Sequence, residues 1–357
     1  MNSLTCPAAE AMTVVVNARN GAREFECNPG EKILHAGLRS GLELPYECAT
    51  GTCGSCKARL VSGRPMSEWP DAPGGRYLKS EAELLMCQCV AHEGCVLEIA
   101  VPLKERDAGA PAPRPLGGTL RALRRLTHDV ASFDIDLDGA LDFEAGQFAL
   151  LTVPGIAGAR AYSMVNFDRL AERLSFVVKK KPGGAVSEWL FGEAVEGARL
   201  GLFAPLGHAT FHPALRKHVL CIAGGSGIAG MMSILSLACA GGHFGDWDGH
   251  VYFGVRTARD AVFLDELEAV RARSPDRLAV TVALSDEEVP ASLAVAHPGF
   301  AFERGFVHAV AGERMKSRFS DIRAYVAGPP PMVDASLRLL LREARLAPSD
   351  IRYDKFS

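Results

Sequence analysis

The chain has 357 residues, 48% of them hydrophobic and 23% charged, so at about 150 residues per domain it is long enough for two or three domains and too apolar to be disordered. Its formal net charge of −3 gives no basic footprint, which excludes nucleic acid and anionic membranes as expected partners. The N-terminal sequence MNSLTCPAAEAM has no basic segment followed by an apolar one, so we expect no secretory signal and a cytoplasmic location. The ten cysteines are then expected to be reduced thiols or metal ligands.

Composition predicts a multi-domain fold with a linker between the first domain and the rest. Residues 1–106 hold eight of the ten cysteines, and residues 107–115 are rich in Pro, Gly and Ala, which is typical of a semi-rigid linker. Residues 116–213 contain β-type runs between turn residues, and this pattern predicts a small antiparallel β-barrel. Residues 214–357 alternate short apolar runs with helical patterns, which predicts a doubly wound parallel α/β sheet.

Residues 48–56, CATGTCGSC, have the C-x4-C-x2-C spacing of a plant-type [2Fe–2S] site, whose fourth cysteine comes from far downstream. Gly51 and Gly54 allow the loop to turn its N–H groups toward the sulfurs. Structural zinc usually takes two Cys-x2-Cys pairs, and this region has only one. The first three predicted metal ligands are Cys48, Cys53 and Cys56.

Spacing alone leaves Cys87, Cys89 and Cys95 as candidates for the fourth ligand. Here the chain resembles the plant-type ferredoxin domains of oxygenase reductases, which have a β-grasp fold and carry the last ligand in a Leu-x-Cys-Gln/Cys context. Leu85-Met86-Cys87-Gln88 matches that context, so the resemblance implies Cys87. The remaining cysteines of this region are expected to be ordinary thiols: Cys6, Cys27, Cys89 and Cys95.

Arg160-Ala161-Tyr162-Ser163 ends a strand-like run and suits a flavin. Arg160 can pair with a pyrophosphate, Tyr162 can stack on an isoalloxazine ring, and the Ser163 hydroxyl can reach the flavin edge, where it would act as a catalytic group. Alone, the tetrapeptide is explained better by a strand-end ion pair beside a core tyrosine.

A second motif supports the flavin interpretation. Gly183-Gly184-Ala185-Val186-Ser187 follows the apolar run that ends at Val178-Lys179 and begins a helical pattern, as expected for a pyrophosphate site. The run Lys179-Lys180-Lys181 either adds charge for the phosphates or is a solvated charge run. Together with Gly146-Gln147-Phe148, these motifs resemble the FAD-binding barrel of the ferredoxin–NADP reductase superfamily.

Residues 225–230 spell G-x-G-x-x-G between a strand and a helix, but Arg256 stands where the Rossmann fingerprint needs an acid after the next strand. The loops resemble the nicotinamide loops of the same superfamily, with Gly230 where Pro is usual and Ala327 where Cys is frequent. The implied nucleotide-binding residues are Gly225, Ser226, Gly227, Ile228, Arg256, Gly328, Pro329, Pro330 and Met332. No clustered basic pocket is visible, which favours NADH over NADPH.

All three domains in this order resemble the single-chain reductases of bacterial multicomponent oxygenases, and most of all those of toluene 4-monooxygenase and phenol hydroxylase. The narrower likeness lies in residues 69–74, 305–308 and 353–356, and it implies that Phe356 shields the flavin ring. The implied activity is transfer of hydride from NADH to FAD and of single electrons through a [2Fe–2S] cluster. The implied acceptor is a diiron hydroxylase or a small ferredoxin, reached by a monomeric reductase.

Three alternatives remain open at this stage. A Rieske oxygenase could replace the diiron partner, because the substrate chemistry belongs to a protein outside this chain. The chain could also be a stand-alone NADH:acceptor reductase, or an electron carrier whose flavoprotein portion is degenerate, for which Gly230 and Ala327 are the only indications.

Overall fold

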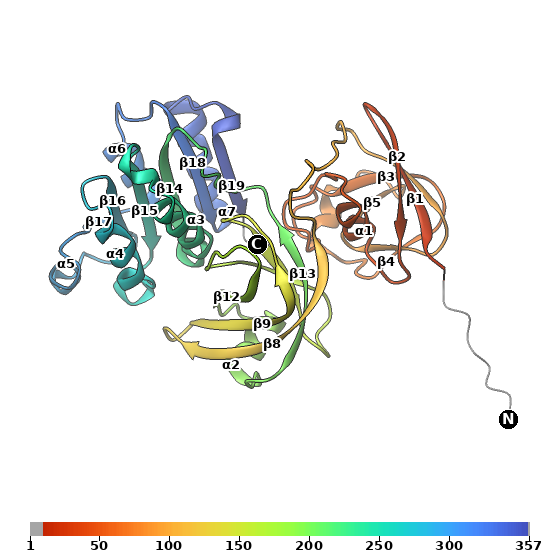
Figure 1. The fold of residues 1–357 in the computed structure, drawn as a ribbon, viewed down its shortest axis with the longest axis horizontal. Helices are drawn as coiled ribbons and strands as arrows, with labels where there is room; N and C mark the ends of the chain where they lie inside the picture. Colours follow the sequence, from red (N-terminus) through yellow and green to blue (C-terminus); the bar gives the residue numbers. More distant parts are fainter. Residues whose placement is uncertain (1–9, 356–357) are drawn as a thin grey trace. The chain divides into compact units, whose positions relative to one another are not determined.

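The computed structural model describes residues 10–355 and divides the chain into two compact units, residues 1–114 and 115–357 (Figure 1). Two positions considered above, Cys6 and Phe356, lie outside the described residues. No helix in the described part of the chain is long and apolar enough to cross a membrane.

The first unit has a mixed five-stranded sheet in the order β2-β1-β7-β3-β5, in which β1 and β7 are parallel and the other neighbours are antiparallel. Helix α1 packs on this sheet, which gives the predicted β-grasp arrangement. A small sheet pairs β4 with β6. The elements are β1 (Met12–Ala18), β2 (Gly21–Cys27), α1 (Ile33–Arg39), β3 (Lys57–Ser62), β4 (Pro65–Ser67), η1 (Pro73–Tyr77), β5 (Glu83–Leu85), β6 (Cys89–Ala91) and β7 (Cys95–Glu98).

Side-chain alternation explains how this unit forms its core. Val14 and Val16 are fully buried, because successive residues of β1 face opposite sides of the sheet. Gly37 allows α1 to approach closely, since a Cβ at this position would lie 3.2 Å from the ring of Phe25 and would overlap Leu44.

The second unit begins with an antiparallel six-stranded sheet in the order β11-β10-β13-β8-β9-β12. A bridge between Met164 and Phe176 joins the two edges of this sheet and curls it into a barrel. Phe133 and Phe176 face each other in register across β9 and β12 and stack inside the barrel with ring centroids 5.4 Å apart. The elements are β8 (Arg114–Arg125), β9 (Val130–Leu141), β10 (Phe148–Thr152), β11 (Arg160–Ser163), β12 (Ala171–Lys179), α2 (Ala185–Gly192) and β13 (Arg199–Leu206).

The rest of this unit is a parallel six-stranded sheet in the order β17-β16-β15-β14-β18-β19, with helices on both faces (Figure 1). Val219 and Cys221 pack with the side that holds α3 and α4, whereas Leu220 and Ile222 pack with α6 and α7. The elements are β14 (His218–Gly224), η2 (Gly225–Gly227), α3 (Ile228–Ala240), η3 (His243–Gly245), β15 (Gly249–Val255), η4 (Ala258–Asp260), α4 (Leu264–Ala272), β16 (Leu278–Leu284), α5 (Ala291–Ala296), β17 (Ala301–Arg304), α6 (Val307–Arg314), β18 (Ile322–Gly328), α7 (Pro330–Arg338), a π-helical turn (Leu339–Glu343), η6 (Pro348–Asp350) and β19 (Ile351–Lys355).

The fold class expected from the sequence is therefore confirmed in each part: a β-grasp unit, an antiparallel barrel and a doubly wound parallel sheet. The barrel and the parallel sheet meet at the start of α3. The N–H of Gly146, in the loop before β10, donates to Ser233 Oγ at 2.9 Å, and that hydroxyl donates to the carbonyl of Gly230 at 2.9 Å. This contact fixes the barrel against the glycine-rich end of β14.

Candidate functional site

The predicted iron–sulfur residues converge in the first unit. The thiol of Cys56 lies 3.2 Å from the sulfur of Cys87, although the two residues are 31 positions apart. Both side chains are buried, with exposed fractions of 2% and 1%, whereas Cys48 and Cys53 are half-buried. The loop that carries Cys48, Cys53 and Cys56 has a left-handed backbone at Ala49, Gly51 and Gly54, as a tight turn around a compact group requires.

Hydrogen-bond donors surround these sulfurs. The N–H of Thr50 points to Cys48 Sγ at 3.4 Å, and the side-chain amide of Gln88 points to Cys87 Sγ at 3.4 Å. A hydrogen bond from the thiol of Cys53 lowers the pKa of Cys48 to about 4, and the corresponding bond from Cys56 lowers the pKa of Cys87. The same two hydrogen bonds, together with burial, raise the pKa of the donors Cys53 and Cys56. Cys48 and Cys87 therefore favour the thiolate, and N–H groups point to both sulfurs, which suits a metal cluster.

The other three described cysteines of this unit, Cys27, Cys89 and Cys95, are buried thiols. Burial raises the pKa of Cys89 to about 11, and the Cys95 thiol donates to the carbonyl of Glu93 at 3.2 Å. The thiol of Cys27 donates to the carbonyl of Glu31 at 3.3 Å. All three thiols are buried, and burial raises their pKa values and so favours the neutral form.

The segment that includes η1 packs directly on the cysteine loop. The N–H of Gly74 donates to the carbonyl of Gly51 at 2.8 Å, and a Cβ on Gly54 would lie 2.6 Å from the ring of Tyr77. From the sequence, residues 69–74 were notable only because they resemble the reductases of toluene 4-monooxygenase and phenol hydroxylase. The structure gives part of this segment a role in holding the loop, which no local pattern in the sequence indicates.

The flavin residues predicted on β11 lie at the junction of the barrel and the parallel sheet. Ser163 is buried, and its hydroxyl has no hydrogen-bond partner among the described residues. It faces Gly230 at the start of α3, where an added Cβ would lie 3.4 Å from Ser163 Oγ. A buried hydroxyl without a partner is costly, so it fits the polar edge of a flavin.

The three residues before Ser163 on β11 are half-buried. Burial raises the pKa of Tyr162 to about 12, so its ring stays neutral, and the ring also packs on the barrel core. Arg160 donates to the carbonyl of Ala159 at 2.9 Å and is half-buried, and no carboxylate pairs with it among the described residues. Ala161 is half-buried between these two residues.

The turn before α2 has the predicted shape. Gly183 takes a φ of 72°, and the helix begins at Ala185 directly after Gly184. The N–H of Gly183 donates to Glu188 Oε1 at 2.9 Å, so a carboxylate already lies at the helix start. Two further residues of this motif face inward: Val186 is 2% exposed, and Ser187 accepts the N–H of Lys181 and donates to the carbonyl of Gly184.

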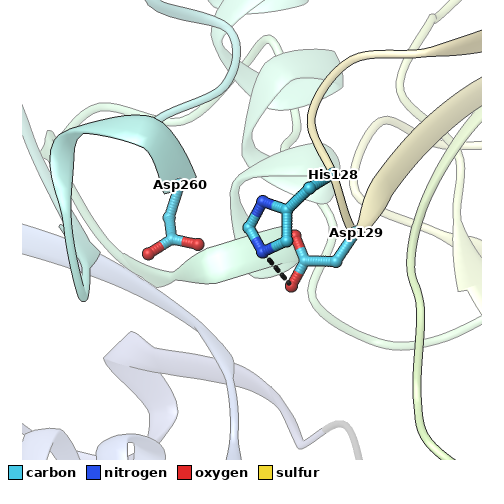
Figure 2. A group of neighbouring side chains, drawn as sticks. All are labelled: His128, Asp129 and Asp260. Atoms are coloured by element: carbon cyan, nitrogen blue, oxygen red, sulfur yellow. Dashed lines mark ion pairs between the residues drawn. The ribbon is translucent and has the colours of Figure 1, made fainter.

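Val178 is buried in the barrel core, and Lys179 after it meets two carboxylates. Its ammonium lies 3.0 Å from Asp129 Oδ2 in the barrel and 3.7 Å from Asp260 Oδ1 beside the parallel sheet. Figure 2 shows these carboxylates with His128, which lies 3.7 Å from Asp129. Because the Lys179 ammonium contacts both carboxylates and offsets part of their negative charge, this group of side chains is better described as an ion-pair network than as a metal site.

The predicted nicotinamide loops lie together at the carboxyl end of the parallel sheet. Gly225–Gly227 forms a single turn after β14 and leads into α3 at Ile228, and Ser226 is half-buried on that turn. A Cβ on Gly227 would lie 2.5 Å from the carbonyl carbon of Ala327 and 2.9 Å from the nitrogen of Gly328. The two loops therefore touch backbone to backbone.

The second loop continues from Gly328, whose φ is 151°, through the exposed Pro329 to Pro330, where α7 begins. The Met332 methyl group lies over both loops, since it would be 2.9 Å from a Cβ on Gly224. Parallel sheets bind nucleotides at this edge, so the geometry suits a dinucleotide. Arg256 is exposed at the same edge, directly after β15.

Strand β19 brings the last described residues to this edge as well. Asp354 is in register with Ala327, and Lys355 is in register with Gly328 and forms an ion pair with Asp334 at 2.6 Å. Sequence patterns did not predict this strand. Phe356 would follow it directly, but it lies outside the described residues.

Comparison with known families assigns all three parts. The family described as 2Fe-2S iron-sulfur cluster binding domain matches residues 16–92, the oxidoreductase FAD-binding domain matches 118–211 and the oxidoreductase NAD-binding domain matches 221–337. The protein is therefore an iron–sulfur flavoprotein oxidoreductase that uses a nicotinamide nucleotide.

Whole-length relatives define the family. A ferredoxin–NAD(P)+ reductase of Metapseudomonas resinovorans is 36% identical over 92% of this chain and 96% of its own length. The ferredoxin–NAD+ reductase component of an alkene monooxygenase system from Xanthobacter autotrophicus is 33% identical over 94% of this chain and 99% of its own. The chain belongs to the family of ferredoxin–NAD(P)+ reductase components of oxygenase systems.

A solved structure supports this assignment. The ferredoxin reductase in carbazole 1,9a-dioxygenase matches with a TM-score of 0.82 and 33% identity, over 98% of this chain and 100% of that one. The family includes reductases of both monooxygenases and dioxygenases, such as the phenol 2-monooxygenase reductase component of a Pseudomonas species, which is 30% identical over 93% of this chain and 91% of its own.

Proposed function

We propose that this protein takes electrons from NADH and delivers them singly to a diiron hydroxylase or to the small ferredoxin that serves one. The observation that carries the proposal is the unpartnered Ser163 hydroxyl, buried between the barrel and the first nicotinamide loop, where a flavin and a nicotinamide would meet. When bound, FAD accepts a hydride and releases its two electrons one at a time to a cluster that carries single electrons.

The proposed cluster ligands are Cys48, Cys53, Cys56 and Cys87. The 3.2 Å approach of the Cys56 and Cys87 sulfurs supports this set, because two thiols from distant parts of the chain meet in a buried loop. The N–H groups that point at the sulfurs would stabilise the negative charge of the bound cluster and tune its potential.

The proposed flavin site uses Arg160, Tyr162 and Ser163 together with the glycine turn before α2. Arg160, without a carboxylate partner, would hold the pyrophosphate, and Tyr162 would lie against the ring. The Ser163 hydroxyl would donate to the flavin edge that accepts hydride, and Phe356 would cover the ring. Glu188 would have to leave the N–H of Gly183 before a phosphate could approach that turn.

The proposed nicotinamide site uses the loops at 225–228 and 328–332, with Arg256 beside the adenosine. We propose NADH as the donor because acidic residues lie near Arg256: the N–H of Asp286 donates to the Arg256 carbonyl at 2.9 Å, and the Glu287 carboxylate accepts the N–H of Ala258. These carboxylates would disfavour the additional phosphate of NADPH.

We also propose that residues 1–106, 116–213 and 214–357 are the three cofactor domains, joined by a linker at 107–115. The protein would act as a monomer in the cytoplasm, where its thiols remain reduced. Relatives serve both monooxygenases and dioxygenases, so a Rieske oxygenase is the second candidate acceptor.

Anaerobic titration of the purified protein with NADH tests the proposed function. The flavin absorbance and the cluster bands should both bleach, and NADPH should act at least tenfold less efficiently, which corresponds to about 1.4 kcal/mol. If neither band bleached, the chain would not be a working reductase. Equal NADH turnover with and without a purified oxygenase would indicate a stand-alone reductase instead.

Substitution of two neighbouring cysteines tests the ligand set. Cys87→Ser should abolish the rhombic electron paramagnetic resonance signal of the reduced cluster, or change it strongly. Cys89→Ser, the matched control at a buried thiol two residues away, should retain the signal. The opposite pattern would show that the fourth ligand is Cys89.

A further inference from the structure

A cavity of about 280 Å³ lies at the amino end of the parallel sheet, where β15, β16 and β17 begin. The nucleotide loops lie at the carboxyl end of the same strands, so this cavity is separate from the nicotinamide site. Its size is at the lower end of the range for small-molecule pockets, too small for a nucleotide and sufficient for a small anion.

Positive charge dominates the cavity lining. Arg271, Arg277, Arg314 and Arg318 supply guanidinium groups, and Asp248 and Asp276 supply the carboxylates. Two of the arginines are already paired, since Arg277 lies 3.0 Å from Asp248 and Arg314 pairs with Glu303. The uncompensated positive charge therefore comes from Arg271 and Arg318.

Three side chains that line the cavity have unused hydrogen-bonding groups. Arg271 Nε is buried without a hydrogen-bond partner in the described part of the chain. Arg318 forms no hydrogen bond or ion pair through its side chain with any residue in the range 10–355. His250 is only 8% exposed, and its ring likewise forms no hydrogen bond to the described residues.

These groups come from different elements: Arg271 from α4, His250 from β15 and Arg318 from the segment between α6 and β18. Arg271 Nε is the buried donor of this group, whereas Arg318 is exposed. A folded protein normally pairs a buried donor, because leaving it unpaired costs about 1–3 kcal/mol. The unpaired Arg271 Nε, which lines the same cavity as the unpaired guanidinium of Arg318 and the ring of His250, therefore indicates a ligand that supplies acceptors. Packing fixes Arg271 in place, since its guanidinium lies 2.6 Å from where a Cβ on Gly299 would be.

We propose that this cavity binds a small oxyanion, a phosphoryl or carboxylate group, between the guanidinium groups of Arg271 and Arg318, with the ring of His250 as a further donor. Paired N–H donors on a planar guanidinium match the paired oxygens of either group. Asp276 is the lining carboxylate without a partner among the described residues; it is exposed, so water can screen its repulsion of the anion. The site goes beyond the proposed electron transfer and does not depend on it.

Calorimetric titration of the flavin- and cluster-loaded protein tests the proposal, with inorganic phosphate in one arm and succinate in the other at constant ionic strength. The arm that binds more tightly identifies the chemistry as phosphoryl or carboxylate. Arg271→Gln and Arg318→Gln should each weaken binding of that anion at least tenfold. Arg273→Gln, the matched control, removes an arginine at the end of α4 that does not line the cavity, and it should bind like the parent protein.

Histidine NMR gives a second readout that a merely structural role would not move. At an anion concentration near the Kd of the parent protein, the ring resonances of His250 should shift in the parent protein and in Arg273→Gln, and much less in Arg318→Gln. Because Arg318 is exposed, its substitution should leave the fold intact. The proposal is overturned if neither anion binds with a Kd below about 10 mM, or if all three glutamine variants bind equally well.

Discussion

Gly227 and Gly230, at the start of α3, can both be replaced by alanine, and we expect opposite effects on stability because different atoms surround the two positions. Gly227 precedes the helix with a φ of −60° and a ψ of −20°, and Gly230 lies in its first turn, so alanine fits the backbone at both positions. A Cβ on Gly230 would lie 3.4 Å from Ser163, an ordinary contact. A Cβ on Gly227 would overlap the carbonyl of Ala327 and lie 2.9 Å from the nitrogen of Gly328.

The expected magnitudes follow from these contacts. Replacing a helical glycine by alanine gains about 0.5–1 kcal/mol, so Gly230→Ala should stabilise the unit by that amount. Gly227→Ala gains a similar amount but forces two backbone loops apart, which costs about 1–3 kcal/mol or more. At roughly 2–4 °C per kcal/mol for a unit of this size, we expect Gly230→Ala to raise the melting temperature by about 1–4 °C and Gly227→Ala to lower it by several degrees.

Release of flavin fluorescence on heating measures both variants in the loaded, full-length chain. Free FAD must be held at one fixed excess, because bound ligand stabilises the folded state by mass action. The same samples can be assayed for NADH-dependent reduction of ferricyanide, which reports whether the added methyl group over Ser163 disturbs hydride transfer. Gly227→Ala should lose this activity more than Gly230→Ala does, because its loop contacts the second nicotinamide loop.

Equal effects of the two substitutions would contradict the difference in packing between Gly227 and Gly230. If Gly230→Ala lowered the melting temperature as much as Gly227→Ala, neither position at the helix start would tolerate a side chain. The 3.4 Å contact between a Cβ at Gly230 and Ser163 would then not be the ordinary contact that we assume. A rise in melting temperature for Gly227→Ala would show that the loops are not packed as closely as the structure has them.

Two further changes concern charge. Lys179→Met should lower the melting temperature of the loaded protein by about 2–4 °C, because it leaves Asp260, which is 7% exposed, without its counter-charge. Adding Asp260→Asn should recover part of the loss. An unchanged melting temperature of Lys179→Met at low salt would show that the ion-pair network does not stabilise the protein. Burial, and then the charge of Arg318, lower the pKa of His250 from 6.5 to about 4, so between these pH values the unfolded chain binds a proton that the folded chain does not. The free energy of unfolding should therefore fall by up to about 3 kcal/mol as pH drops from 6.5 to 4, and His250→Gln should be less acid-sensitive in denaturant titrations; equal acid sensitivity in both proteins would contradict this origin.

The sequence predicted most reliably those features that depend on neighbouring residues. Short motifs determine the local backbone conformation, so they predict turns reliably. The structure has turns at three such motifs: residues 48–56, 183–184 and 225–227. Buried central strands were also predictable, because their apolar runs are continuous: the run at 219–223 lies within β14, and the run at 278–284 coincides with β16.

The missed elements are those in which the apolar signal is weak. Strands β17 and β19, AFER and IRYDK, are edge strands with half-exposed residues, so they lack both a continuous apolar run and a clear alternation. Residues 332–344 carry one of the helical patterns of the third domain, but the α-helix continues only to Arg338 and is followed by the π-helical turn at 339–343. A change in hydrogen-bond register of this kind leaves no mark in side-chain periodicity.

Contacts between distant residues that belong to no motif could not be predicted from one sequence. The ion pair of Lys179 with Asp260 joins residues from the barrel and the parallel sheet, and the hydrogen bond from Gly146 to Ser233 spans 87 positions. The three lysines at 179–181 suggested phosphate binding or a solvated run, whereas the structure gives the first of them two carboxylate partners. Only the folded chain brings these charges together.

The uneven exposure of the cysteines has a practical consequence for labelling. Among residues 10–355, Cys48 and Cys53 are the cysteines that reach solvent in part, and every other described cysteine is buried. Alkylating reagents react with accessible thiolates, so a loaded cluster would protect the loop and leave the native protein unreactive once Cys6 is replaced by serine. A cysteine introduced at an exposed position such as Val195 would then be a single attachment point for a fluorophore or spin label.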